Sequence, residues 1–489
     1  MIRPTKASQS WFQSVTNFPF RIYSVALVLR LIPVLFSMNM GIGLDDMFQY
    51  DMLARSLVTG NGYRWYAEAD LALIQPLIHL DLTSSAYDPR GVLTSFRAPL
   101  YPAFLAIIYF FAGVEAKRFF VARLVQAVVM ATLAPLTYSL SRRFYPDRPR
   151  TAMISAWTIA LYPTLVIYPL ALVTENLFFI LVLCSVLVLL VAAEKSTWQW
   201  FALGGALLGL MALTRSISLA VAGLVMLWIW FVLKNRRMTF VVIASVSLVV
   251  LPWMIRNMLV FHRLTGIETS LGYNLYVGYH PDGTGTFEYP QSLDLMSMLD
   301  DGQRDMIGSQ KAVEFIKNDP GRFIYLAARR TGYFFGLERR ALTYFYSNNY
   351  FGYIPKAGLL IIAALFCLPF VVVSTSGVLG LVLTHRGRET ILILLFFIGY
   401  ILPHIFILAE DRFHLAMLPF LAILAAYSWT SGKVKMKEGW ATRSGRVLIL
   451  LAFVGITLLF LNWGLELWRD AGKLALLFGP NGNMTSFSY

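Results

Sequence analysis

Three carboxylates follow directly after a long apolar stretch near the N-terminus. The stretch covers about 22–40, and the segment 41–66 that follows it reads GIGLDDMFQYDMLARSLVTGNGYRWY. A carboxylate beside lipid is costly to desolvate, so acids placed there are candidates for function. The segment has helical spacing, and an acid on such a helix at the edge of a bilayer could serve as a general base toward a substrate held by its lipid tail. The three acids are Asp45, Asp46 and Asp51.

Arginines and one further acid stand at the ends of other apolar stretches. Arginine offers a planar fork of donors to phosphate oxygens and keeps its charge at all relevant pH values. Several arginines with one or two carboxylates would suit a substrate that is both lipid-linked and phosphorylated. The candidates are Arg97 in RAPLYP, Glu175 in LVTENLFF, Arg215 in ALTRS, Arg256 in PWMIRN and Arg412 in AEDRFH.

Each of these residues also has a purely structural interpretation. Asp46 with Gln49 three residues later forms a capping box, so Asp46 could simply cap a helix. An arginine at the end of a span commonly reaches toward the headgroups, and Glu175 could complement a helix dipole. His404 and His414 stand near the ends of adjacent apolar stretches, and they are too isolated to indicate a metal site.

The composition requires a membrane. Of the 489 residues, 57% are hydrophobic and only 14% are charged, and the mean hydropathy is +0.63, so we predict an all-α polytopic membrane protein. The net charge of +14 comes from short loops between apolar stretches, which indicates the positive-inside rule and not a nucleic acid partner. Cys184 and Cys367 lie within apolar stretches, and no motif for a metal or other cofactor is present, so we expect none. A metal requirement stays open.

We expect about 11 transmembrane helices. A twelfth segment, 97–114, is apolar, but if it crossed, the N-terminus would lie opposite to every other basic loop. The positive-inside rule therefore predicts a juxtamembrane or re-entrant helix there. The expected spans are 22–40, 119–140, 151–168, 175–193, 199–214, 218–233, 238–255, 357–383, 389–407, 413–430 and 447–466.

This topology places the candidate acids and arginines on the outer face. Two long outer segments, 41–118 and 257–352, carry juxtamembrane helices in this prediction, including an interfacial helix at 311–336. We expect a catalytic transmembrane domain over 1–430. Residues 431–489 would then form a basic cytoplasmic loop, the last transmembrane helix and a short outer tail.

Six pieces of the chain, in order, resemble motifs of the GT-C glycosyltransferases that use polyprenyl-phosphate sugars. That group includes the protein O-mannosyltransferase-like enzymes, the bacterial aminoarabinose transferases and the lipopolysaccharide-core transferases. The matching pieces are DMFQYDMLARSLVTGNGY, FRAPLYPAFLAIIYFFAG, LYPTLVIYPLALVTENLFF, GGALLGLMALTRS, PWMIRNMLVFHRLTGIETSLGYNLYVGYHPDGTG and EDRFHLAMLPFLAILAA.

The resemblance implies an inverting glycosyltransferase with a GT-C fold, which transfers a sugar from a polyprenyl-phosphate donor to an acceptor hydroxyl. Asp46 would be the base, because Tyr50 then takes the expected spacing. Asp45 is the alternative, since the mannosyltransferases use the first acid of an Asp-Glu pair. Arg97 would bind the donor phosphate, with Arg256 as a second candidate. Tyr50, Tyr101, Glu175, Arg215 and Arg412 would line the cavity.

The resemblance also implies where the reaction takes place and with what partners. The acceptor would be a lipid, a polysaccharide or a protein, and the membrane a bacterial inner membrane with the site facing the periplasm or cell exterior. The alternative function is an envelope flippase or secondary transporter. Such proteins place ionisable groups near the bilayer midplane, often in repeated halves. Here the charged candidates collect at one surface and no half-repeat is visible.

Overall fold

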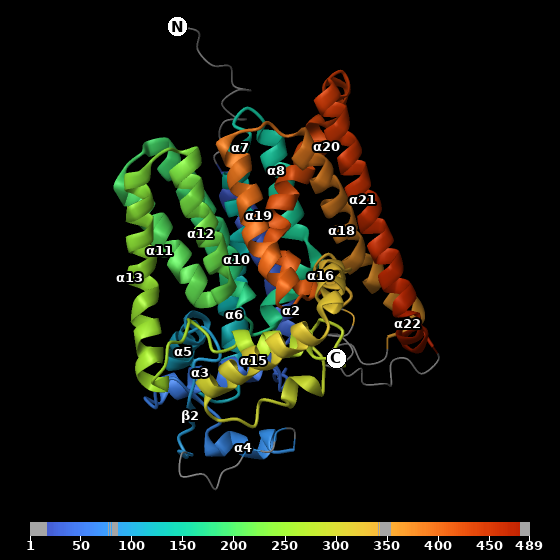
Figure 1. Cartoon of the computed structure of the whole chain (residues 1–489). Helices are drawn as coiled ribbons and strands as arrows, with labels where there is room; N and C mark the ends of the chain where they lie inside the picture. The colour runs from blue at the N-terminus through green and yellow to red at the C-terminus, as the bar shows by residue number, and fades with distance from the viewer. Residues whose placement is uncertain are drawn as a thin grey trace.

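A bundle of apolar helices forms most of the molecule, as Figure 1 shows for the computed structural model. The structure describes residues 17–76, 78, 80, 87–340, 342 and 354–479. Short helices gather at one end of the bundle, at the bottom of Figure 1, and we call this the outer end. The bundle consists of α2 (Phe18–Phe36), α6 (Lys117–Ala131), α7 (Leu133–Phe144), α8 (Pro149–Leu161), α9 (Pro163–Ile167), α10 (Glu175–Lys195), α11 (Trp198–Thr214), α12 (Leu219–Leu227), α13 (Arg236–Phe261), α18 (Lys356–Leu383), α19 (Arg388–Phe406), α20 (Leu418–Trp440) and α21 (Arg443–Arg469).

Every expected span is helical in the structure. In its described part, eight helices are long and apolar enough to cross a membrane, and the bent pair Pro149–Leu161 and Pro163–Leu170 would make a ninth. The other two expected spans are the shorter apolar helices Trp198–Thr214 and Ser216–Val232. The described helices therefore agree in place with all 11 expected segments, and eight or nine of them have the length of a full span.

The outer end carries the remaining elements. Helix α5 has 13 residues, so it is about 20 Å long and too short to cross the hydrocarbon core, as its expected juxtamembrane position requires. The elements of this end and of the C-terminus are α3 (Asp46–Val58), β1 (Arg64–Trp65), α4 (Glu68–Ile74), β2 (Val92–Leu93), α5 (Leu100–Ala112), α14 (Leu271–Tyr279), α15 (Asp301–Asn318), α16 (Pro320–Phe334) and α22 (Ala471–Leu477).

Two local differences from the expected elements have simple causes. The interfacial helix expected at 311–336 is interrupted at Asp319, where α15 ends. Pro320 begins α16 there, and the Asp319 side chain accepts from the Arg322 N–H as its cap. The basic stretch 432–446 is mostly helical, because α20 continues to Trp440 and α21 begins at Arg443.

Two local features determine how the elements around the site pack. Strands β1 and β2 pair antiparallel, with Arg64 opposite Leu93, and so return the chain beside α3 just before Arg97. In α11, Gly205 and Gly209 let the backbone approach α13, because an added Cβ would lie 2.8 Å from Ser245 Cβ or Val249 Cβ. Arg215 follows directly after this closely packed helix.

The break between α8 and α9 is closed by an arginine inside the bundle. Pro163 has no N–H to donate to the carbonyl of Ile159, so the helix cannot continue there. The guanidinium of Arg30, which is completely buried on α2, lies 3.4 Å from the Ile159 carbonyl oxygen and 3.5 Å from that of Ala160. This side chain supplies donors that the broken backbone lacks.

Candidate active site

The carboxylate of Asp46 is shared by two arginines from distant parts of the chain. One carboxylate oxygen accepts a hydrogen bond from Arg97, and the other lies 3.0 Å from Arg412 Nη2. The Nε of Arg97 also donates to Gln49 Oε1 at 2.7 Å. Burial alone would raise the pKa of Asp46, but the charges of Arg97 and Arg412 outweigh it and hold that pKa well below its ordinary value. The two guanidinium groups therefore favour the ionised form of Asp46.

Arg412 connects Asp46 to two further acids. Its Nε lies 2.7 Å from Glu410 and 4.0 Å from Glu175. Glu175 is only 3% exposed and pairs with Arg215 at 2.7 Å. The site is thus a continuous network of alternating charges, which no single segment of the chain could form.

The local backbone explains why these charges lie together. Asp46 and Glu175 are the first residues of α3 and α10, where the positive end of the helix dipole favours a carboxylate. Arg215 is the C-cap residue that follows α11, and Arg412 lies in the short 3-10 helix Asp411–Met417. The ends of these four helices therefore meet at the outer end and point polar groups at one place.

Glu410 completes the network on its far side. Its side chain pairs with Arg340 at 3.2 Å as well as with Arg412. Burial would raise the pKa of Glu410, but the charges of Arg340 and Arg412 outweigh it and lower the pKa to about 2. Glu410 and Arg340 were not among the candidates from the sequence, although the charged run AEDR around Arg412 could have indicated Glu410.

Asp45 has a different role from Asp46. It is the N-cap residue of α3, and its side chain accepts from the Met47 N–H at 2.9 Å. Capping, the structural interpretation considered for Asp46, therefore belongs to Asp45, and Gln49 contacts Arg97 instead of closing a capping box. Desolvation and the charge of Asp46 raise the pKa of Asp45, and the Met47 N–H and the charge of Arg412 act in the opposite direction.

The two candidate tyrosines lie behind the network. Tyr50 is buried on α3, its ring 5.4 Å from the Arg97 guanidinium carbon and edge-on to Tyr101 at 5.1 Å. Tyr101 is completely buried, and its hydroxyl donates to Gln126 Oε1 at 2.6 Å. In this structure both rings support Arg97 and α3, and the Tyr101 hydroxyl is held inside the protein.

Arg256 is not part of the network around Asp46. Its guanidinium donates to the Thr94 carbonyl at 2.8 Å and lies 3.4 Å from the Tyr63 carbonyl oxygen. It also lies 4.9 Å from the Trp253 ring. Arg256 thus holds the segment that leads to Arg97, and the structure does not bring its charge to Asp46.

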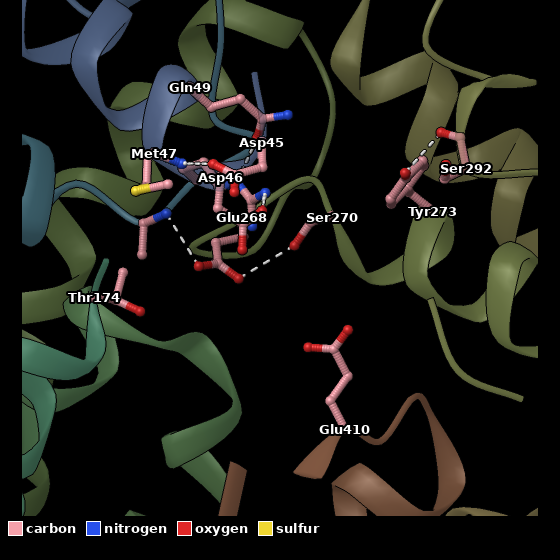
Figure 2. A network of polar contacts seen from close by, with 12 residues as sticks. Asp45, Asp46, Met47, Gln49, Thr174, Glu268, Ser270, Tyr273, Ser292 and Glu410 are labelled. Carbon is pink, nitrogen blue, oxygen red and sulfur yellow. Dashed lines mark hydrogen bonds and ion pairs between the residues drawn. The ribbon is translucent and has the colours of Figure 1, made fainter. Parts of the chain in front are cut away.

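Glu268 is a further acid at the site that the sequence did not indicate. Its carboxylate accepts from the Ala98 N–H at 3.0 Å and from the Ser216 hydroxyl at 2.7 Å. Figure 2 shows Asp46, Glu268 and Glu410 reaching into the same region from separate elements. Nothing in a lone GIETS sequence distinguishes this glutamate, because its partners are far away along the chain.

The hydrogen bonds of the two candidate histidines are structural, and the buried His404 Nε2 has no hydrogen-bond partner among the described residues. His414 is completely buried, with Nδ1 2.9 Å from the Phe334 carbonyl oxygen and Nε2 3.1 Å from Glu338. His404 Nδ1 lies 3.3 Å from the Leu408 carbonyl oxygen. Among the described residues, no three His, Cys, Asp or Glu side chains are grouped so that they could hold a metal ion.

Residues 97–255 match a protein family described as dolichyl-phosphate-mannose-protein mannosyltransferase. A comparison with curated proteins gives no match in sequence. Among solved structures, the chain is similar to the Archaeoglobus fulgidus oligosaccharyltransferase in its apo form, with a TM-score of 0.51 and 15% identity over 98% of this chain and 61% of that one. ArnT from Cupriavidus metallidurans bound to undecaprenyl phosphate gives a TM-score of 0.38 and 13% identity, over 86% and 79% of the two chains.

The likeness to the oligosaccharyltransferase extends over nearly the whole of this chain, which spans about three fifths of that protein's length. The order and apolar character of the helices agree with the GT-C architecture expected from the six motifs. The chain is therefore an integral membrane protein with the GT-C fold.

Proposed function

We propose that this protein is a glycosyltransferase that moves a sugar from a polyprenyl-phosphate carrier to an acceptor hydroxyl at the outer face of the membrane. The observation that carries the proposal is that Arg97 and Arg412 both pair with Asp46, the first residue of α3. A proton acceptor and two phosphate-binding cations thereby lie within reach of one small substrate group.

The proposed reaction is an in-line displacement at the anomeric carbon of the sugar. A bond forms between the acceptor oxygen and the anomeric carbon while the bond from that carbon to the phosphate oxygen breaks. The polyprenyl phosphate leaves with the electron pair, and Asp46 takes the proton of the acceptor hydroxyl. The displacement inverts the anomeric centre, and a positioned base contributes about 10²–10⁴-fold to such a step.

The ion pairs of Asp46 suggest how donor binding prepares the base. A phosphate group that approaches Arg97 and Arg412 offers these arginines a second anionic partner, so it competes with the Asp46 carboxylate. Loss of either pairing raises the pKa of Asp46, which makes it a better proton acceptor. The leaving phosphate gains negative charge in the displacement, and the same guanidinium groups then stabilise it.

Arg215, Glu175 and Glu410 have supporting roles in this proposal. Glu175 and Glu410 fix the orientation of Arg412 through its Nε, and Arg215 compensates the charge of Glu175. Removal of one such partner leaves a buried charge without compensation, which is strongly destabilising. These residues therefore keep the phosphate-binding groups in place before the donor arrives.

Transfer by the purified protein tests the proposal. The protein, reconstituted in lipid, is incubated with polyprenyl-phosphate sugars labelled in the sugar, and envelope fractions serve as acceptors. The proposal expects label transfer that Asp46→Asn abolishes. Absence of transfer from every such donor, with a folded protein, would refute it. Mass spectrometry of envelope glycans and glycolipids from cells that lack the protein would then identify the sugar and the acceptor class by the mass lost.

The proposed orientation has its own test. Single cysteines replace Leu44, which is 50% exposed beside Asp46, or Glu438 at the opposite end of the bundle, in a variant without Cys184 and Cys367. A membrane-impermeant thiol reagent added to intact spheroplasts should label the cysteine at position 44 and not the one at 438. The reverse pattern would place the site on the cytoplasmic side and exclude the proposed reaction.

A further inference from the structure

Glu268 contacts the immediate neighbours of two different arginines of the site. Its Oε1 accepts from the Ala98 N–H at 3.0 Å, next to Arg97, and its Oε2 accepts from the Ser216 hydroxyl at 2.7 Å, next to Arg215. The Ser270 hydroxyl also donates to Oε2, at 3.2 Å. A single partly exposed carboxylate thus joins three segments that are far apart in the sequence, and Figure 2 shows it beside Asp46.

The Tyr63 hydroxyl already holds the carbonyl side of the first segment, at 2.9 Å from the Arg97 oxygen and 3.2 Å from the Ala98 oxygen, whereas Glu268 accepts from its N–H side. The Ala98 N–H precedes the first turn of α5, so it has no partner within that helix and needs an acceptor from elsewhere. Arg215 has extended backbone where α11 ends, with φ of −148°. In such short connections, side-chain contacts determine the backbone path, and a shift of about 1 Å at a binding group is enough to lower catalysis severely.

A second contact makes the arrangement more rigid on the Arg97 side. The Thr269 N–H donates to the Ser95 carbonyl at 2.9 Å, and the two hydroxyl groups of these residues lie 3.2 Å apart. The segments around 95–98 and 268–270 therefore run side by side, held at both ends. Glu268 connects these two segments to Ser216, which lies between the bundle helices α11 and α12.

We propose that Glu268 is a positioning residue that sets the relative placement of Arg97 and Arg215, and through them the site for the donor phosphate. Only the statement about the donor phosphate rests on the proposed function. The positioning depends on hydrogen-bond acceptors and not on negative charge. Glutamine at this position keeps an oxygen for the Ala98 N–H and an amide group for the serine hydroxyls, so it should preserve the arrangement, whereas alanine should not.

Hydrogen–deuterium exchange of the whole protein in detergent, without any ligand, tests the positioning directly. Glu268→Ala should speed exchange in peptides covering 94–105 and 211–219 together, and Glu268→Gln should leave both within about threefold of wild type. Ser216→Ala removes one contact and should affect only the second peptide. Glu288→Ala is the matched control, because the carboxylate of this partly buried acid of the same outer segment accepts from the N–H and hydroxyl of Thr284 and is part of neither peptide. Unchanged exchange in both peptides for Glu268→Ala would overturn the inference.

Affinity for a polyprenyl monophosphate, measured on the same variants, tests the consequence. Glu268→Ala should raise the dissociation constant at least tenfold, with Glu268→Gln and Glu288→Ala within threefold of wild type. Equal weakening by the glutamine and alanine variants would overturn the positioning role, since it would mean that the charge itself acts on the ligand. Altered exchange in a protein that binds no polyprenyl phosphate would support the positioning and refute the proposed function instead.

Discussion

Replacement of Asp46 by asparagine separates its chemistry from its structural role. The substitution keeps the size of the side chain and one acceptor oxygen, but removes the charge that two guanidinium groups share. The amide nitrogen then faces one arginine that was a partner of the carboxylate. Arg97 retains Gln49, and Arg412 retains Glu410, so neither cation is left without a partner.

The magnitudes differ between activity and stability. Loss of the base should reduce the turnover number by about 10²–10⁴-fold, which corresponds to about 3–5 kcal/mol of transition-state stabilisation. One charge-assisted hydrogen bond is lost, worth about 1.5–3 kcal/mol when buried. The Asp46 side chain is 27% exposed and its partners keep other contacts, so we expect a loss of about 1–2 kcal/mol in folding free energy.

The assay compares Asp46→Asn with Asp45→Asn under the same conditions. Asparagine caps a helix about as well as aspartate, so the Asp45 variant should keep α3 and most of its activity. Transfer of labelled sugar from a polyprenyl-phosphate donor is followed together with thermal unfolding. An inactive Asp45→Asn variant beside an active Asp46→Asn variant would refute the assignment of the base and make Asp45 the proton acceptor.

Three further substitutions have separate expected outcomes. Glu410→Gln should remove the part of the pH dependence of thermal unfolding that lies between pH 4.5 and about 2. Because the folded-state pKa of Glu410 is depressed, its stabilisation of the wild-type protein is present above pH 4.5 and is lost as the pH falls toward 2. Arg412→Lys should lower kcat/KM for the donor about 10–100-fold, since a point charge cannot contact three carboxylates at once; unchanged donor kinetics would remove Arg412 from the site. Tyr101→Phe leaves Gln126 Oε1 without the hydroxyl donor and should cost about 1–3 kcal/mol in stability, seen as a lower Tm. Sugar transfer by this variant should stay within threefold of wild type. A large loss of transfer at unchanged Tm would instead indicate that Tyr101 contacts the substrate.

The sequence was sufficient for the fold because the signals there are additive along the chain. Each span is a run of apolar residues, and basic residues beside these runs decide their direction. Charge alone predicted that 97–114 does not cross, and α5, with 13 residues, is too short for a full span. The end of the interfacial helix at Asp319 was missed, although a proline one residue later marks it in the sequence.

The site could be predicted only in part, because its contacts depend on where helix ends meet. Asp46, Arg97, Glu175, Arg215 and Arg412 were candidates from their positions beside apolar stretches, and the structure brings all five into one network.

Arg256 has the same kind of position, but it turns to backbone carbonyls. Glu268 accepts hydrogen bonds from neighbours of the arginines that lie 170 and 52 residues away, and no local pattern could indicate these contacts. The sequence shows which charged residues lie beside apolar stretches. Only the fold shows which partners each of them contacts.

The buried guanidinium of Arg30 has a consequence for biogenesis. An arginine within a lone apolar helix costs about 2.5–3.5 kcal/mol during insertion. Apart from the Ala26 carbonyl of the same helix, 3.0 Å away, the carbonyl groups that offset this cost belong to a segment made about 130 residues later. Helix α2 therefore reaches its final depth without this full cost only when the kinked pair α8–α9 arrives beside it. We therefore expect an intermediate during synthesis in which α2 lies near the membrane surface or remains bound to the insertion machinery.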